Sequence, residues 1–227
     1  MSMLIGMMLC FCALEPSEML PGVWVEKGVV EIDASVAMDC HHPETPDVYL
    51  EMLITGPDSR EHESLLVSSA LPSNLHAGLL AAGFEPGHPV SFEDGKRVSA
   101  TGDVIAIDVR VDGSEKWVGL VEWVVHVQGG TALAADVGWA GLVFAGSEIL
   151  EGGEYAGDRE GALVSLTPWG FEVVSPAWVL SPDASVDEPV WIADRTQVPE
   201  IGVPVRVRFR STDPLPNADS DDNEGDD

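Results

Sequence analysis

The chain has 227 residues, of which 45% are hydrophobic and 22% are charged, a globular composition that excludes a wholly disordered protein. Its 39 Asp and Glu residues outnumber 11 Lys and Arg residues, which gives a formal net charge of −28. A surface of this sign repels phosphate backbones, so we expect no nucleic-acid partner. Only seven of the acids lie in residues 212–227, which we predict to be an acidic disordered tail.

An apolar run, MSMLIGMMLCFCAL, opens the chain. It is too short for a stable transmembrane span, which needs about 20 residues, but it has the length of the apolar part of a signal peptide. No Lys or Arg precedes it, and a true start codon upstream would explain this. We therefore assign residues 1–21 to an apolar leader, a truncated signal peptide. We expect export to the periplasm or cell envelope, and a cytoplasmic protein if the leader does not function.

Beyond Pro21-Gly22, β-prone residues dominate the chain. The segments 23–25 and 29–33 predict a hairpin, and the segments VYLEMLITG (48–56) and EHESLLVSS (61–69) predict two more strands. Because the turn between these two strands is short, we expect them to pair antiparallel.

One main α-helix is predicted over residues 73–83. Leu75 and Leu79 recur at helical spacing. Ser73 is placed to act as the N-cap, and Gly83 is placed to end the helix.

The rest of the chain again predicts strands. They are a short strand at 88–92, a long hairpin over 103–127, an apolar strand at 139–150, a hairpin over 161–176 and a closing strand at 204–210. Together the segments predict a β-rich α+β fold. It consists mostly of antiparallel sheet with one main α-helix packed on it, in a single domain at 22–211.

Arginines alternate with apolar residues in the closing strand. Alternation places Arg206, Arg208 and Arg210 on one face. Such a face would suit an anion or carboxylate site, but we favour cross-strand ion pairs with the many acids.

Three separate stretches stand out in the order in which they occur. They are REHESLLV with PSNLHAGLLAAGFEPGHPV, then VEWV, then WAGLVFAGSEI with YAGDREGALVSL, and they span residues 22–210. Together they resemble the YdjY-like domain family of exported bacterial proteins. The resemblance implies no particular activity. It directs attention to polar and small positions, namely Glu61, His62, Glu63, Ser64, His76, Gly87, Pro89, Gly146, Ser147, Tyr155, Asp158 and Gly161.

Iron–sulfur chemistry, which is associated with some members of that family, does not suit this chain. A cluster needs about four thiolates. The chain has three cysteines, two of them in the leader, and no C-x-x-C pattern. We therefore expect no iron–sulfur cluster.

Glu61, His62 and Glu63 are the first candidates for a metal or acid–base site. Strand alternation would place the two glutamates on one face and His62 on the other, so a regular strand cannot direct all three at one ion. His76 becomes the partner of His62 if the helix packs back on the sheet. Two histidines and a carboxylate suit a divalent metal ion such as zinc. Alternatively, the glutamates are a solvated strand end and the histidines are satisfied by their neighbours.

Two other patterns are weaker. Cys40-His41-His42 lies in a proline-bounded loop, from which one side chain could complete a site with His62. The seven tryptophans are spread along the chain, which predicts core or sheet-face positions for most of them and not a sugar-binding platform.

These observations favour an exported, non-catalytic binding or scaffold module at the cell envelope, whose partner is a protein or a small ligand. The alternative is a metal-dependent, hydrolase-like enzyme that uses His62, His76 and either Glu61 or Glu63.

Overall fold

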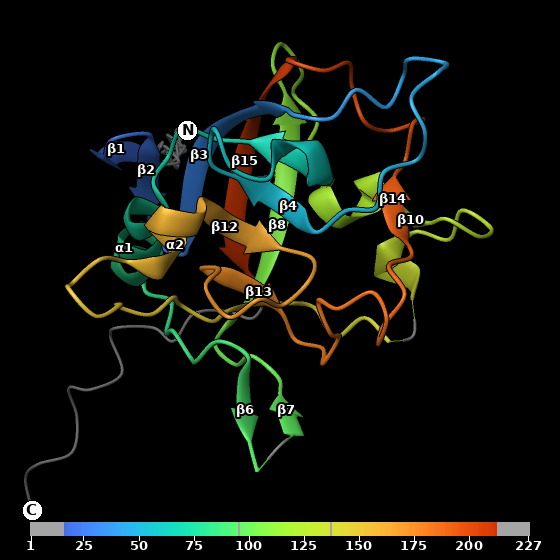
Figure 1. Ribbon diagram of the computed structural model, residues 1–227. Helices are drawn as coiled ribbons and strands as arrows, with labels where there is room; N and C mark the ends of the chain where they lie inside the picture. The colour runs from blue at the N-terminus through green and yellow to red at the C-terminus, as the bar shows by residue number, and fades with distance from the viewer. Residues whose placement is uncertain (1–15, 95, 137, 213–227) are drawn as a thin grey trace, which may run out of the picture.

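A closed barrel forms the centre of the protein (Figure 1). The structure, a computed structural model, describes residues 16–94, 96–136 and 138–212. The barrel strands among them, in order around the barrel, are β3 (Val29–Val36), β15 (Pro204–Ser211), β8 (Val104–Val111), β11 (Leu142–Phe144), β13 (Val174–Pro176), β12 (Ala162–Ser165), β4 (Met52–Thr55) and β5 (Ser64–Val67). Pairing of β5 with β3 closes the ring.

The barrel is mixed rather than antiparallel throughout. Two of its pairings, β4–β5 and β12–β13, are parallel, and the others around the ring are antiparallel. The β-rich prediction is therefore confirmed, but the simple antiparallel sheet is corrected to a closed mixed barrel.

The predicted antiparallel pairing of 48–56 with 61–69 is wrong for a local reason. Residues Glu61–Glu63 form a 3-10 turn, η1, so the strand begins only at Ser64. The longer connection leads the chain back to the start of β4, where Met52 pairs with Ser64. On the way it contacts α2 (Ala156–Glu160), because the Ser59 hydroxyl donates to the Glu160 carbonyl at 2.6 Å.

The hairpin predicted over 161–176 is also a parallel pair. A fully buried carboxylate fixes the connection between its strands. Glu172 Oε2 accepts hydrogen bonds from the backbone N–H groups of Trp169, Gly170 and Phe171. Its other oxygen accepts from the Ser175 hydroxyl. Arg60 of the first connection stacks over Trp169 at 5.0 Å, so the two parallel crossovers meet.

The main helix, α1 (Pro72–Ala82), confirms the prediction, and it ends at Gly83 in a left-handed conformation with φ 97°. It packs on β2 and β3, since a Cβ on Gly78 would lie 2.8 Å from Val23 Cγ1. Ser73 is not the N-cap, which is Leu71. The Ser73 N–H instead donates to Asp158 Oδ1 of α2 at 2.7 Å, so a neighbouring helix supplies the cap.

Shorter elements surround the barrel. They are β1 (Ser17–Leu20), β2 (Val23–Glu26), β6 (Ser91–Glu93), β7 (Lys96–Val98), β9 (Val118–Gly119), η2 (Leu120–Trp123), β10 (Val124–His126), η3 (Leu133–Ala135) and β14 (Trp191–Ala193). The hairpin predicted over 23–33 is confirmed as β2–β3. The hairpin predicted over 103–127 is confirmed only for its β8–β9 part. The remaining strand, β10, lies outside the barrel and pairs with β14. In Figure 1 the β10–β14 pair lies to the right of the barrel, opposite α1 and α2.

The predicted leader and tail lie almost entirely outside the described residues, so export stays a prediction. Residues 17–20, within the predicted leader, form β1 and pair with β2.

Candidate functional site

A cavity of about 330 Å³ lies beside the start of β4. Leu50 and Glu51 form one wall, and Leu166 of the β12–β13 connection forms the next. His126 of β10 and Trp191 of β14 form a third wall, and the loop 178–190 closes the cavity. The backbone joins these parts directly, because the Leu50 N–H donates to the Trp191 carbonyl and the Leu166 N–H donates to the Glu51 carbonyl.

Tryptophans make the cavity wall rigid. Trp178 and Trp191 stack with ring centroids 6.4 Å apart and planes 15° apart. Trp139 meets Trp178 edge-on at 5.0 Å, and the Trp178 indole N–H donates to the Leu166 carbonyl at 3.2 Å. The tryptophans were predicted to be scattered, but β14 and two loops bring these three together.

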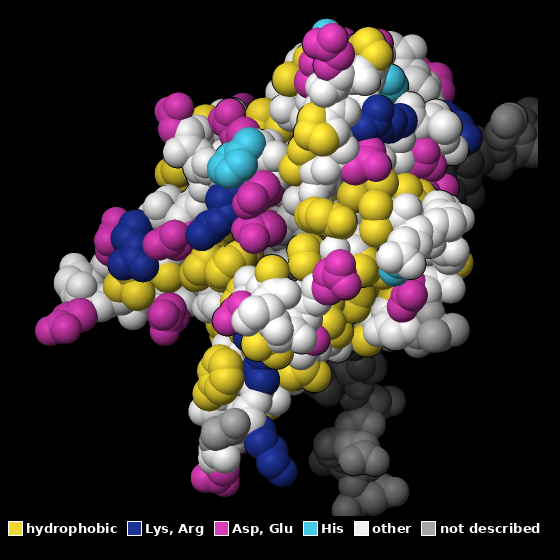
Figure 2. Space-filling model, turned by 45° about the vertical axis from the view of Figure 1, so that its right-hand side comes forward, with side chains coloured by type: hydrophobic (Ala, Val, Ile, Leu, Met, Phe, Trp, Pro, Cys, Tyr) yellow, Lys and Arg dark blue, Asp and Glu magenta, His cyan; other side chains and the backbone are white. Residues whose placement is uncertain are grey.

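The charges around the cavity have one sign. Its carboxylates are Glu51, Asp136, Asp187 and Glu188, and the described lining residues include no Lys or Arg. Two of them shape the wall, since Asp187 accepts the Ser181 N–H and Asp136 accepts the Gly138 N–H. Figure 2 brings the β10–β14 side of the molecule forward, and hydrophobic side chains cover the middle of this face with Asp and Glu side chains among them.

Glu51 is the most perturbed carboxyl group at the cavity. Parallel pairing of β4 with β5 places it next to Glu63, whose carbonyl accepts the Glu51 N–H at 3.0 Å. Burial, the charge of Glu63 and a hydrogen bond with its side chain raise the pKa of Glu51 to about 7. Arg60 acts in the opposite direction, with Nε 3.9 Å from Glu51 Oε2. Glu63 is thus a predicted site residue that the structure joins to the cavity.

The other members of the EHE motif have local contacts. Because Glu61–Glu63 is a 3-10 turn, the expected alternation of a strand does not apply. Glu61 Oε1 accepts the Asp58 N–H at 3.0 Å. The His62 side chain is 76% exposed, and its Nε2 lies 3.9 Å from Glu63 Oε1.

His76 belongs to a separate network. Its Nδ1 lies 2.7 Å from the Tyr155 hydroxyl, and its ring meets Phe144 edge-on at 4.9 Å. Burial lowers the pKa of His76 and raises the pKa of Tyr155 to about 12. Both shifts favour the neutral forms, so the Tyr155 hydroxyl can donate a hydrogen bond to the neutral His76 ring.

This network joins α1 to α2 through the Gly146-Ser147 segment. The Tyr155 oxygen also accepts the Ser147 N–H at 3.1 Å, and Ser147 Oγ accepts the Gly157 N–H at 3.0 Å. Gly146 has φ 67°, and a Cβ there would lie 3.0 Å from His76 Cε1. These positions, singled out by the family resemblance, hold elements together.

The four residues predicted to share a metal thus have different surroundings. Among residues 16–94, 96–136 and 138–212, no three His, Cys, Asp or Glu side chains are grouped so that they could hold a metal ion. The metal site stays a prediction. In the other candidate loop, Cys40 is buried and the His41 ring contacts the Val198 carbonyl at 2.7 Å.

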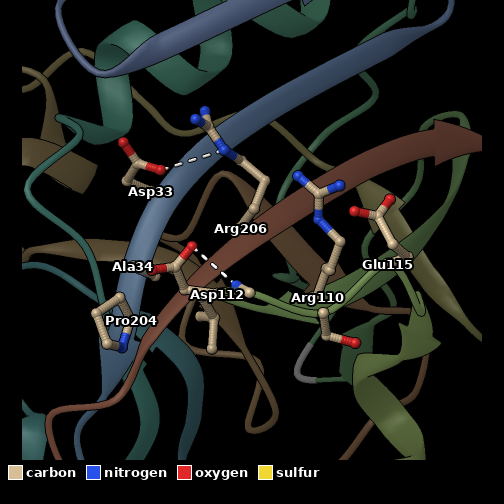
Figure 3. Close-up of a pocket in the computed structure, with 10 residues that line it drawn as sticks. Asp33, Ala34, Arg110, Asp112, Glu115, Pro204 and Arg206 are labelled. Atoms are coloured by element: carbon tan, nitrogen blue, oxygen red, sulfur yellow. Dashed lines mark hydrogen bonds and ion pairs between the residues drawn. The ribbon is translucent and has the colours of Figure 1, made fainter.

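The arginine face of β15 forms the predicted ion pairs. Arg206, Arg208 and Arg210 contact Asp33, Glu31 and Asp108 at 3.2, 2.9 and 2.6 Å. Arg206 also borders a polar cavity of about 340 Å³ (Figure 3), beside its cross-strand neighbour Arg110. Since Asp33, Asp112 and Glu115 line the same cavity, its charges are mixed.

Sequence reasoning missed Glu51, Trp178 and Trp191. A local signal existed for Glu51, because both Glu51 and Glu63 stand just before an apolar strand, in EMLI and ESLL. The tryptophans carried no such signal, because they are distant in sequence.

In the part of the chain that the structure describes, no helix has the length and apolarity that crossing a membrane requires.

Comparison with known proteins places the chain in a family. No curated protein and no solved structure matched. A family model described as the YdjY domain matches residues 23–210, which include the barrel, both glutamates and the tryptophan-lined cavity. The chain therefore belongs to the YdjY domain family.

Proposed function

We propose that this protein is a non-catalytic binding module and that the tryptophan-lined cavity beside Glu51 is its ligand site. The observation that carries the proposal is the stacked pair Trp178–Trp191 on the wall of a preformed cavity of about 330 Å³. Sites for small molecules have this character: a concave apolar wall with a few polar groups, at volumes of roughly 300–1,000 Å³.

Rigidity of the wall supports binding. Trp191 is 7% exposed and fixed by its strand, and Trp178 is held by its indole hydrogen bond to Leu166. Side chains fixed in this way lose little conformational entropy when a ligand arrives, so more of the contact energy appears as affinity.

The test is a screen of small aromatic, amine and sugar compounds against the full chain, followed by tryptophan fluorescence and by protein NMR. We expect binders whose affinity falls at least about tenfold in an Ala184→Trp variant, because an indole at this lining position occupies the cavity mouth. Ala81→Trp, at an exposed position on α1, is the matched control and retains binding.

Two outcomes contradict the proposal. One is a screen without any binder. The other is a set of binders whose affinities are the same in the Ala184→Trp and Ala81→Trp variants.

A further inference from the structure

We infer that the ligand of this cavity is a small organic cation, held by Trp178 and Trp191 and by the carboxylate of Glu51, which Glu63 contacts from outside the lining. The inference rests on the proposed function, and it specifies the chemical class of the ligand.

The first support is the distribution of charge. Four carboxylates line the cavity, and the nearest guanidinium to Glu51, Arg60, contacts it only at 3.9 Å. Arg60 is itself shared with Glu160, at 4.0 Å, and stacks on Trp169. Arg97, outside the lining, interacts electrostatically with Asp187. These two guanidinium groups only partly neutralise the four carboxylates of the cavity. A net charge of −28 adds a field that draws cations toward the molecule.

The second support is how the protein uses its half-buried indoles outside the cavity. Arg206 lies over Trp24 at 4.1 Å, and Arg208 lies over Trp117 at 3.8 Å. Arg60 lies over Trp169 in the same way. Among the described residues, no Lys or Arg lies over Trp178 or Trp191. Other rings already cover part of these indoles, because Trp178 contacts Trp139 and Trp191, and Trp191 also meets His126 edge-on at 5.5 Å. A cation from solution would therefore contact the parts of the two rings that border the cavity, where the ring quadrupole attracts positive charge.

The third support is the pairing of Glu51 with Glu63. Two neighbouring carboxylates repel each other when both are ionised, so the empty site retains a proton near neutral pH. A bound cation stabilises the doubly ionised pair and displaces that proton. Binding should therefore release protons and strengthen as the pH rises. Asp136, Asp187, Glu188 and His126 also face the cavity, and Arg60 faces Glu51 from the η1 side.

The experiment compares choline with 3,3-dimethylbutan-1-ol, which has the same shape without the charge. Isothermal titration calorimetry is run on the full chain at about pH 6 and about pH 8, in two buffers of different ionisation enthalpy. We expect choline to bind at least about tenfold more tightly than the alcohol, the scale of a desolvated cation–π contact. We also expect the choline affinity to rise severalfold between the two pH values, with proton release.

Variants separate the groups involved. Glu51→Gln should weaken choline and remove most of the pH dependence, while the alcohol is unaffected. Glu154→Gln, an exposed carboxylate outside the cavity, is the matched control. Because histidine also gains a proton as pH falls, His126→Gln is measured in parallel and should retain the pH dependence.

Equal affinities for choline and the alcohol would overturn the proposal that the ligand is a cation. Choline binding that is unchanged in Glu51→Gln would overturn it as well. If neither probe binds but neutral compounds of the screen do, the cation proposal is wrong, while the proposed binding site is retained. A screen without any binder would instead remove the proposed function.

Discussion

At the scale of single residues, the position of Glu51 shows how backbone pairing creates chemistry. Glu51 and Glu63 immediately precede two neighbouring parallel strands, so their side chains lie together at the same end of the barrel. An antiparallel pair of the same two segments would have placed the start of one strand beside the end of the other. The like-charged pair therefore follows from strand direction.

The raised pKa of Glu51 predicts a dependence of stability on pH. Glu51 binds its proton more tightly in the folded protein, with a pKa of about 7, than in the unfolded chain, near 4.5. The stability that the folded protein gains from this tighter proton binding is complete below about pH 4.5, and it is lost as the pH rises through about 7. Because the Glu51 side chain is 28% exposed, solvent reduces the effect. At about pH 8, Glu51→Gln should be more stable than wild type by on the order of 1 kcal/mol.

Urea denaturation of both proteins at a series of pH values measures this difference. It should shrink toward zero in acid, where Glu51 is neutral in both states. Glu154→Gln, at an exposed position, serves as the control. A Glu51→Gln protein that is less stable than wild type at alkaline pH would contradict the assignment.

At the scale of elements, short connections that look like hairpins produced parallel pairs. Side chains inside the connections made the difference: η1 and the Ser59 hydrogen bond in one, and the buried Glu172 in the other. A buried carboxylate that accepts several backbone N–H groups stabilises a turn that the pattern of apolar residues does not reveal.

A glycine just before β8 tests the packing of these elements. Gly102 has φ 137°, and a Cβ there would lie 2.0 Å from the Phe144 carbonyl oxygen of β11. Gly102→Ala should therefore cost about 3 kcal/mol or more of unfolding free energy, or prevent folding. Gly113, at the β8–β9 turn, also has a positive φ of 77° but open space around it, so Gly113→Ala should cost only about 1–2 kcal/mol.

Thermal and urea denaturation compare the two glycine variants directly. Equal losses at both positions would show that the left-handed backbone, and not the contact with β11, determines the cost.

At the scale of the whole molecule, the charge of −28 makes the folded state repel itself. We therefore expect the melting temperature to rise by several degrees between about 0.02 M and 0.5 M NaCl, because the Debye length shortens from tens of ångströms to a few. Scanning calorimetry at the two salt concentrations measures this change in melting temperature. Ion pairs such as Arg208–Glu31 weaken in salt, so a fall in melting temperature would mean that they outweigh the repulsion.

Export belongs to the same scale and stays a prediction, because residues 1–15 of the predicted leader lie outside the described residues. The family model matches residues 23–210, and the predicted domain bounds of 22–211 stay a prediction.

Local information in the sequence determined what local physics controls. The β-prone segments, helix α1 with its end at Gly83, the β2–β3 hairpin and the arginine face of β15 all follow from periodicity and turn chemistry. The family was recognisable because its stretches are contiguous in sequence.

Only the tertiary structure decided which of the chemically active residues meet. His76 pairs with Tyr155, 79 residues away, and Glu63 meets Glu51 through a parallel register. Trp178 stacks with Trp191, which lies at the start of β14 in the two-stranded β10–β14 sheet outside the barrel. Contacts of this kind depend on strand order and direction, which are set by the closing of the whole barrel. No single segment carries that information.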